Sequence, residues 1–319
     1  MKRIAVLTTG GDAPGMNPAI RAVVRYGISQ KLEVTGIYRG WWGLINEEVQ
    51  VLNHRSVSGI INQGGTILKT ARCTELQTKE GQERAYNTIK KYAIDGLVVI
   101  GGNGSFTAAH DFGLKYKVPC VGIPASIDND INGIDVTIGA DTAINTALNA
   151  IDNIRDTATS MERVFVVEVM GRDCGFIALA VALAGGCEDV IIPEIELDLK
   201  KMCHDIVEGN IRGKVSWIIV LAEGSGHAQD IAKSITDMTS LETRSVVLGH
   251  IQRGGRPTAV SRDLALRLGQ AAVDCLLQGR YDRAVGISCG RVNEVDFATA
   301  IKKKELNAEY WHNLIRILT

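Results

Sequence analysis

Short apolar runs rich in β-branched residues alternate with helical stretches along the whole chain of 319 residues. In the first half they are RIAVLT (3–8), EVTGIY (33–38), GLVVIG (96–101) and PCVGIP (119–124). In the second half they are RVFVVEVM (163–170), DVIIPE (189–194), SWIIVLAEG (216–224), RSVVLGH (244–250) and AVGISC (284–289). Nearly continuous apolar strands separated by helices indicate parallel sheets covered on both faces. The sequence therefore predicts an α/β fold, and so many strands predict two sheets and two domains.

A helix is predicted between the two halves, over residues 141–159, where apolar side chains recur at helical spacing. Asp141 is placed to cap its N-terminus, and the helix is expected to open the second domain. No Ser/Pro-rich linker separates the halves, so the domains are expected to pack closely with a cleft between them. Ligands of such sheets bind beyond the carboxyl ends of the strands, so the loops there are the candidate sites.

The composition excludes several classes of partner. Because 35 basic residues balance 36 acidic ones, the chain has no general attraction to nucleic acid or to an anionic membrane. No apolar stretch reaches the roughly 18 residues that span a bilayer, and the N-terminal run is too short for a secretory signal. Seven cysteines without a CxxC pair suit a reducing compartment. We expect a cytoplasmic protein that acts on a small molecule.

Three glycine-containing segments follow or flank predicted strands of the first half: TTGGDAPGMN (8–17), QGGTILKTARC (63–73) and GGNGS (101–105). Glycines leave backbone N–H groups free to approach a phosphate, and a helix N-terminus adds a favourable dipole. The alternative for each is a tight turn. Neither a Walker A loop nor the dehydrogenase pattern GxGxxG is present, so the three together favour a different kind of nucleotide site.

Carboxylates follow another predicted strand in IPASIDNDI (123–131). Asp128 and Asp130 come just after Ser126, where side chains project beyond the sheet edge. One carboxylate there can take a proton from an attacking alcohol while the other helps to hold magnesium, as phosphoryl transfer requires. The alternative is an Asx-rich turn.

Cationic side chains mark strand ends in the second half. Arg172, His250 and Arg253 follow strands, and Arg163 and Arg244 begin them. Arginine binds phosphate with two parallel hydrogen bonds, so the group favours a phosphorylated substrate. Arg163 and Arg244 have surface ion pairing as an alternative, and His250 has a structural role.

Three further side chains have two interpretations each. Glu223 ends a strand and either accepts hydrogen bonds from sugar hydroxyls or caps a helix. Trp41 and Trp42 either stack on a purine or pack in the core.

The motifs TTGGDAPGMN, GGTILKTAR, GGNGS, PASIDND, IRDTATS, EVMGRDCG, LAEG and LGHIQRGGRPT occur in an order that, taken together, resembles the bacterial ATP-dependent 6-phosphofructokinases from end to end. The resemblance implies two Rossmann-like three-layer α/β/α domains with mainly parallel sheets and the active site in the cleft between them. It implies an ATP-binding large domain of residues 1–138 plus 251–303 and a sugar-phosphate-binding small domain of residues 139–250 plus 304–319. A homotetramer with shared active sites is also expected.

The implied reaction transfers the γ-phosphoryl group of ATP to the 1-hydroxyl of fructose 6-phosphate with magnesium. Its products are fructose 1,6-bisphosphate and ADP, a step of glycolysis. One alternative is a regulatory paralogue that binds nucleotide or sugar phosphate with little activity, and another is a variant that uses pyrophosphate.

The resemblance also assigns roles to individual residues. Asp128 falls on the catalytic base, Arg172 on the group that stabilises the transferring phosphoryl, and Ser126 on a hydroxyl residue that contacts it. The implied ATP contacts are Gly11, Arg72, Cys73, Gly102, Gly104 and Ser105. The implied sugar-phosphate contacts are Ser126, Asp128, Asp130, Arg163, Met170, Gly171, Arg172, Glu223, Arg244, His250 and Arg253, of which Arg163 and Arg244 reach in from a neighbouring subunit. The implied effector contacts, for ADP or phosphoenolpyruvate, are Arg21, Arg25, Arg55, Arg155, Gly186, Glu188, Arg212 and Lys214. Magnesium is expected at Asn103 and Asp130, with manganese as an alternative.

The chain departs from the family pattern near the metal and the donor. Asn103 replaces an aspartate and lacks the charge that attracts a hard cation, so weaker metal binding or turnover is expected. Ala125 stands where ATP-using relatives have glycine and pyrophosphate-using relatives have lysine, and Gly104 agrees with the ATP type. Leu76 and Gln77 replace the usual adenine neighbours.

A second group of departures lies at the expected effector site. His54 and Val215 replace cations, and Gly59 replaces an aspartate. Because positive charge is lost at an anion site, weakened or altered allostery is predicted.

Overall fold

The computed structural model describes residues 1–319 and contains two separate β-sheets. The chain forms two units, one of Met1–Thr142 with Arg253–Lys304 and one of Ala143–Gln252 with Glu305–Thr319. Helix α5 (Ala140–Met161) begins in the first unit and continues into the second.

The first unit is built on an eight-stranded sheet with a mainly parallel centre. Its strand order is β12-β11-β5-β4-β1-β2-β3, with β6 paired to β5. Parallel ladders join β2, β1, β4, β5 and β11, whereas β3 and β12 are antiparallel at the edges. The strands are β1 (Arg3–Thr8), β2 (Glu33–Ile37), β3 (Val49–Leu52), β4 (Gly96–Gly101), β5 (Cys120–Ser126), β6 (Ile138–Gly139), β11 (Arg283–Ser288) and β12 (Arg291–Asp296).

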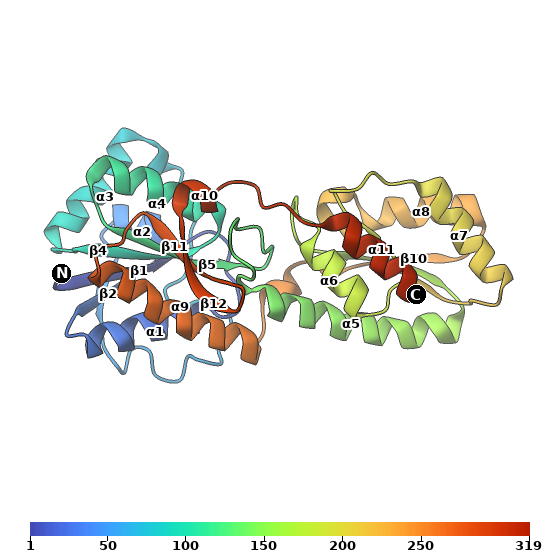
Figure 1. The fold of residues 1–319 in the computed structure, drawn as a ribbon, viewed down its shortest axis with the longest axis horizontal. Coiled ribbons are helices and arrows are strands. Elements are labelled where there is room, and N and C mark those ends of the chain that lie inside the picture. The colour runs from blue at the N-terminus through green and yellow to red at the C-terminus, as the bar shows by residue number, and fades with distance from the viewer. The chain divides into compact units, whose positions relative to one another are not determined.

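Helices cover both faces of this sheet (Figure 1). On one face α1 (Met16–Ser29) packs along α9 (Ala259–Leu277). On the other face lie α2 (Gly40–Ile45), α3 (Lys79–Lys91), α4 (Asn103–Tyr116) and α10 (Phe297–Ala300), with the short 3-10 turn η1 (Glu75–Gln77) beside α3. The central strands are buried on both sides, which explains their uninterrupted apolar sequence.

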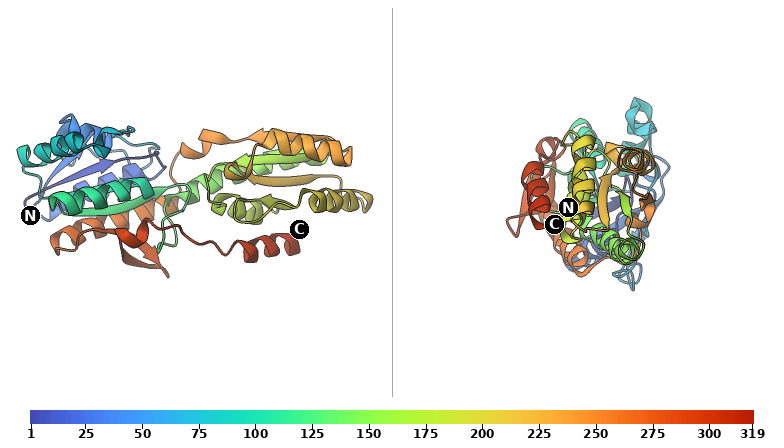
Figure 2. Two further views of the ribbon diagram at one scale, coloured as in Figure 1. Left: turned by 90° about the horizontal axis from the view of Figure 1, so that it is seen from above. Right: turned by 90° about the vertical axis from the view of Figure 1, so that its right-hand side faces the viewer.

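The second unit has a four-stranded, all-parallel sheet in the order β10-β7-β9-β8. Its strands are β7 (Val164–Val169), β8 (Asp189–Ile191), β9 (Trp217–Ala222) and β10 (Thr243–Val247). Its helices besides α5 are α6 (Phe176–Ala184), α7 (Leu199–Ile211), α8 (Ala228–Thr239) and the C-terminal α11 (Ala308–Leu318), with the 3-10 turn η2 (Glu223–Ser225). The 3-10 turn η3 (Gly249–Arg253) lies in this unit except for its last residue, Arg253, which belongs to the first. The left view of Figure 2 shows α11, in red, along one side of this unit, where it packs against α6.

The predicted α/β class is therefore confirmed, and every predicted strand is present within a few residues of its expected bounds. The cap prediction at Asp141 was wrong. Helix α5 begins one residue earlier, at Ala140, and the Asp141 carboxylate accepts a hydrogen bond from the hydroxyl of Thr258. None of the helices combines the length and the apolar character that a membrane crossing needs.

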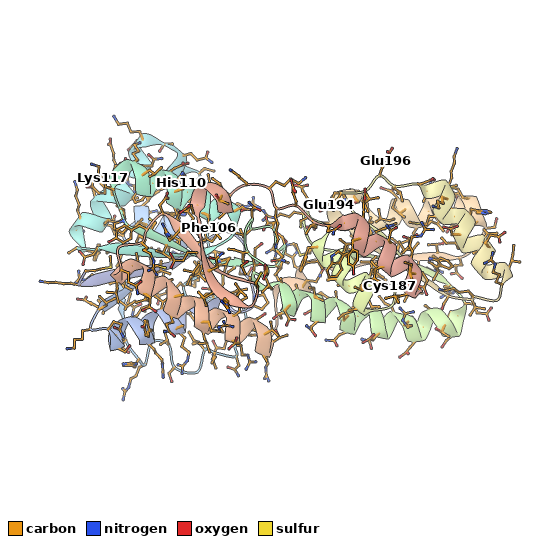
Figure 3. The ribbon with its side chains drawn as sticks, in the orientation of Figure 1. Phe106, His110, Lys117, Cys187, Glu194 and Glu196 are labelled. Atoms are coloured by element: carbon orange, nitrogen blue, oxygen red, sulfur yellow. The ribbon has the colours of Figure 1, made fainter.

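Gly122 in β5 lies under a pair of aromatic rings. Phe106, labelled on α4 in Figure 3, and Phe297 have ring centroids 5.2 Å apart. A Cβ atom on Gly122 would lie 2.5 Å from Cε1 of Phe106 and 2.7 Å from Cε1 of Phe297. The absence of a side chain at this position is what allows the rings to reach the sheet.

We predict that Gly122→Ala lowers the free energy of unfolding by about 1–3 kcal/mol, because one extra carbon overpacks a filled core. Gly104→Ala is the matched control, since a Cβ there meets nothing within 4 Å. Thermal unfolding of the purified variants measures the difference, and equal melting temperatures for the two would contradict the overpacking argument.

Candidate active site

Three candidate loops leave the first sheet at one edge. Strands β1, β4 and β5 are parallel neighbours, with Thr8 opposite Ile100 and Gly101 opposite Pro124. The backbone continues this alignment beyond the strands, since Thr9 N donates to the carbonyl of Ile100 at 3.0 Å. The segments GGDAP, GGNGS and SIDND are therefore brought together by the sheet itself.

The first loop is packed against Arg253. A Cβ atom on Gly11 would lie 2.7 Å from Nη1 of Arg253, and this nitrogen donates to the carbonyl of Asp12 at 3.3 Å. Gly15, the N-cap of α1, has φ of 118° and has no room for a Cβ beside Ile138. Glycine at these two positions lets a guanidinium group and a helix N-terminus lie next to the loop.

The second loop forms the first turn of α4, with Gly102 as the N-cap. Gly101 has no room for a side chain, because a Cβ would lie 2.3 Å from Oγ of Ser105 and 2.6 Å from the carbonyl of Thr9. The Ser105 hydroxyl donates to that carbonyl at 3.1 Å and ties the two loops together. Gly104, in contrast, is exposed and faces open space. The N–H of Ser105 already donates to the carbonyl of Gly102 at 3.0 Å, so the helix N-terminus is accessible at Gly104, where it suits an anion.

Asn103 and Asp130 form a hydrogen-bonded pair of side chains between the second and third loops. Nδ2 of Asn103 donates to Oδ2 of Asp130 at 2.9 Å and to its carbonyl at 3.1 Å. The other two oxygens, Oδ1 of Asn103 and Oδ1 of Asp130, are buried and have no hydrogen-bond donor. Magnesium binds amide and carboxylate oxygens in proteins, so these two oxygens fit the ion. The pair carries one negative charge, whereas two aspartates would carry two.

The third loop holds Asp128 in an ordered turn. The side chain of Asp128 is 4% exposed, and its backbone N–H donates to Oγ of Ser126 at 3.3 Å. Asn129 has φ of 53° and holds the turn through both ends of its amide, accepting from Thr137 N and donating to the carbonyl of Asp135. An Asx-stabilised turn and a carboxylate at the sheet edge therefore coexist here.

The remaining candidates for nucleotide binding differ in how far they are exposed. Arg72 is exposed, and Cys73 is half-buried against the core, where burial raises the pKa of its thiol. Trp41 is 3% exposed and packs on Phe112, with ring centroids 5.6 Å apart, so its core interpretation holds. The guanidinium of Arg39 lies 5.5 Å from the ring centroid of Trp42.

In the second unit, Arg172 is presented by the loop between β7 and α6. Arg172 is exposed and has φ of 52°, and the preceding Gly171 has φ of 150°. Oε1 of Glu223 accepts from the backbone N–H of Arg172 at 2.8 Å and of Gly171 at 3.2 Å. Met170, at the start of the loop, is buried. Glu223 therefore holds the backbone that carries Arg172.

Arg163 and Arg244 share one counter-ion. Nε of Arg163 lies 2.9 Å from Oε2 of Glu242, and Arg244 pairs with the other oxygen of the same carboxylate. The hydrogen bond from Arg163 contributes most to holding the pKa of Glu242 below its usual value. The parallel pairing of β10 with β7 places Arg244 opposite Phe165, two positions from Arg163, so both arginines reach Glu242. His250 is exposed in η3 beyond β10.

The effector candidates fall into one set on each unit. In the first unit, Nη1 of Arg21 donates to the carbonyl of Val57 at 2.9 Å. Burial lowers the pKa of Arg21, and the positive charge of the nearby Arg25 lowers it further. Arg25 and Arg55 are exposed.

In the second unit, the carboxylate of the buried Glu188 lies 3.2 Å from Nζ of Lys214 and 3.9 Å from Nη1 of Arg155. Arg155 also donates to the carbonyl of Gly186 at 2.8 Å, and Arg212 pairs with Glu208.

Sequence reasoning did not single out Gln252, Glu194 or Glu242, each of which contacts the segments that carry candidate residues. Gln252 is fully buried and accepts from Met170 N at 2.8 Å. It lies between His250 and Arg253 in LGHIQRGGRPT, so the motif was a usable signal. Glu194 and Glu242 had none, since isolated glutamates are common on surfaces.

Comparison with known proteins assigns the family. The model of the family described as phosphofructokinase matches residues 3–276. The chain is 54% identical over 301 residues to a Clostridium acetobutylicum protein named ATP-dependent 6-phosphofructokinase, covering 94% of each chain. It is 51% identical over 319 residues to a protein of that name from Clostridium botulinum, covering 100% of both.

Solved structures agree on the fold. Phosphofructokinase of Saccharomyces cerevisiae matches with a TM-score of 0.90 and 32% identity, over 100% of this chain and 48% of the yeast chain. A pyrophosphate-dependent phosphofructokinase of Marinobacter aquaeolei matches with a TM-score of 0.84 over 97% of this chain and 86% of its own, but at 22% identity, which shows the fold alone. The chain belongs to the phosphofructokinase family.

Proposed function

We propose that the chain is an ATP-dependent 6-phosphofructokinase, a phosphotransferase that converts fructose 6-phosphate and ATP to fructose 1,6-bisphosphate and ADP. The observation that carries the proposal is the convergence of GGDAP, GGNGS and SIDND at one sheet edge. It occurs in a chain at least 51% identical, over its length, to proteins named for this activity.

The nucleotide is assigned to the first unit. The first turn of α4 supplies Gly102, the exposed Gly104 and the buried Ser105, and the loop after β1 supplies Gly11. Backbone N–H groups at a helix N-terminus suit a polyphosphate because they donate hydrogen bonds without bringing bulky side chains. Arg72 and Cys73 are assigned to the same nucleotide on family resemblance.

The sugar phosphate is assigned mainly to the second unit. Glu223 uses Oε1 for two backbone N–H groups, which leaves Oε2 for a sugar hydroxyl. Met170, Gly171 and His250 are placed with it by family resemblance, together with Arg253 of the first unit. The arginines at positions 163 and 244 are proposed to bind the 6-phosphate of a neighbouring subunit's substrate within a homotetramer.

The proposed chemistry requires a base and a charge stabiliser. Asp128 accepts the proton of the attacking sugar 1-hydroxyl, and the hydroxyl of Ser126 donates to the transferring group. Arg172 compensates the negative charge that develops on the phosphoryl oxygens, which is the main contribution a protein makes to this reaction.

Magnesium is proposed at Oδ1 of Asn103 and Oδ1 of Asp130, the two buried oxygens without a donor. A bound magnesium ion would neutralise phosphate charge. The hydrogen bond from Asn103 to Asp130 orients the carboxylate so that its second oxygen is available to the ion.

The donor is proposed to be ATP and not pyrophosphate. Ala125 is 1% exposed and is apolar, so position 125 supplies no lysine ammonium group to a pyrophosphate. A cytoplasmic location accords with the seven cysteines, all of which are free thiols.

The direct test offers purified protein fructose 6-phosphate and magnesium with either ATP or pyrophosphate and measures fructose 1,6-bisphosphate. We expect product with ATP only, and a loss of at least about 100-fold in kcat for Asp128→Asn, because general base catalysis contributes about 10²–10⁴-fold. Product with neither donor would favour the binding paralogue, and product with pyrophosphate alone would favour the other alternative.

We predict that Asn103→Asp binds divalent metal several-fold more tightly, because a second carboxylate doubles the negative charge of the donor set. Without metal the two carboxylates repel, so the melting temperature of the variant should be lower than that of wild type. Adding magnesium should raise the melting temperature of the variant more than that of wild type. Manganese titration followed by electron paramagnetic resonance measures the affinity. Asp130→Asn is the control that should weaken binding. An unchanged metal affinity in Asn103→Asp would remove position 103 from the metal site.

We propose that ADP or phosphoenolpyruvate binds the effector candidates of the two units, and that the allosteric response is altered. His54 and Gly59 are exposed, and Val215 stands beside Lys214, whose ammonium group is already paired with Glu188. We predict weak or absent coupling, which isothermal titration with ADP and with phosphoenolpyruvate measures. Strong coupling of both ligands to fructose 6-phosphate cooperativity would contradict it.

A further inference from the structure

Three side chains from distant segments accept hydrogen bonds from backbone N–H groups of the loop from Met170 to Gly175. Its Gly171 and Arg172 N–H groups donate to Glu223, and Gly175 N donates to Oε1 of Glu194 at 2.9 Å. Glu194, labelled in Figure 3, thereby places a carboxylate at the N-terminus of α6. At the start of the loop, the buried Gln252 accepts a hydrogen bond from Met170 N.

Gln252 is fixed at a position where a small displacement of the Met170 backbone would move the backbone of Arg172. Its side chain is 0% exposed, and Oε1 accepts the N–H of Met170 at 2.8 Å. Arg172 follows two residues later in a left-handed conformation, and a Cβ on Gly224 would lie 2.1 Å from the carbonyl of Arg172. Because the loop is in close contact on that side, a shift of Met170 cannot be absorbed without turning the Arg172 backbone.

The two ends of the Gln252 amide differ. The acceptor oxygen is used on Met170 N, whereas the donor Nε2 is buried and has no hydrogen-bond partner. A buried residue retained only for packing would be served by an apolar side chain, since an unpaired buried donor costs free energy. The acceptor is therefore the part of Gln252 that the fold uses.

We propose that Gln252 is a positioning residue for phosphoryl transfer: its Oε1 sets the Met170 backbone and thereby the direction of the Arg172 guanidinium. The inference rests on the proposed role of Arg172. Gln252 does not touch the reacting groups, and it acts through the loop.

The test compares Gln252→Met, which keeps length and volume but removes the acceptor, with Gln252→Glu, which keeps an acceptor oxygen whether or not it is protonated. For Gln252→Met we expect kcat to fall about tenfold to 100-fold, since a full misplacement of about 1 Å costs up to about 100-fold, with KM for ATP within about twofold. Gln252→Glu should return kcat to within about threefold of wild type.

A double-mutant cycle separates positioning from a general loss of structure. If Gln252 acts through Arg172, Gln252→Met should cost little more once Arg172→Ala is present. Additive losses, or a Gln252→Met variant that keeps wild-type kcat, would overturn the proposal. Inactive wild-type protein would instead overturn the proposed function, so the two failures are distinguishable. If Gln252→Met does not fold, Gln252→Asn, whose amide is too short to reach Met170 N, replaces it in the cycle with the same expected outcomes.

Discussion

The parallel pairing of β1, β4 and β5 is the constraint on which the candidate site depends. Strands that run the same way end at the same edge, so glycine loops more than 90 positions apart are held together by ladder hydrogen bonds. Gly101 and Ser105 complete the alignment, because the one leaves room for the Thr9 carbonyl and the other donates to it. The loop geometry that we propose to bind phosphate in the first unit follows from the sheet register.

Several cations that are proposed to bind anionic ligands already have carboxylate partners. Glu242 pairs with Arg163 and Arg244, and Glu188 pairs with Arg155 and Lys214. An exposed ion pair contributes only about 0–1 kcal/mol, so a phosphate carrying more charge can displace a carboxylate such as that of Glu242 at small cost. Glu188 differs, because it is buried and also accepts from the backbone N–H of Ile218.

The fold class and the central strands were predictable because a sheet buried on both faces needs uninterrupted apolar sequence. Strands β3 and β12 escaped prediction for the same reason. VQVL and RVNEVD are antiparallel edge strands with mostly exposed side chains, so they carry polar residues and lack the signal that identified their neighbours. The role of Asp141 was missed because its carboxylate accepts a hydrogen bond from Thr258, more than 100 positions away, a contact that has no local signal.

The sequence by itself determined the alternation of strands and helices, the order of the glycine and carboxylate motifs, and the asparagine at position 103, since these are properties of adjacent residues. Only the tertiary structure decided which side chains hold the loops. Gln252 meets Met170 across 82 positions, and Glu223 meets Arg172 across 51. Such contacts have no period along the chain. They arise because parallel crossovers return distant strand ends to one edge, and hydrogen bonds between those ends then orient the side chains.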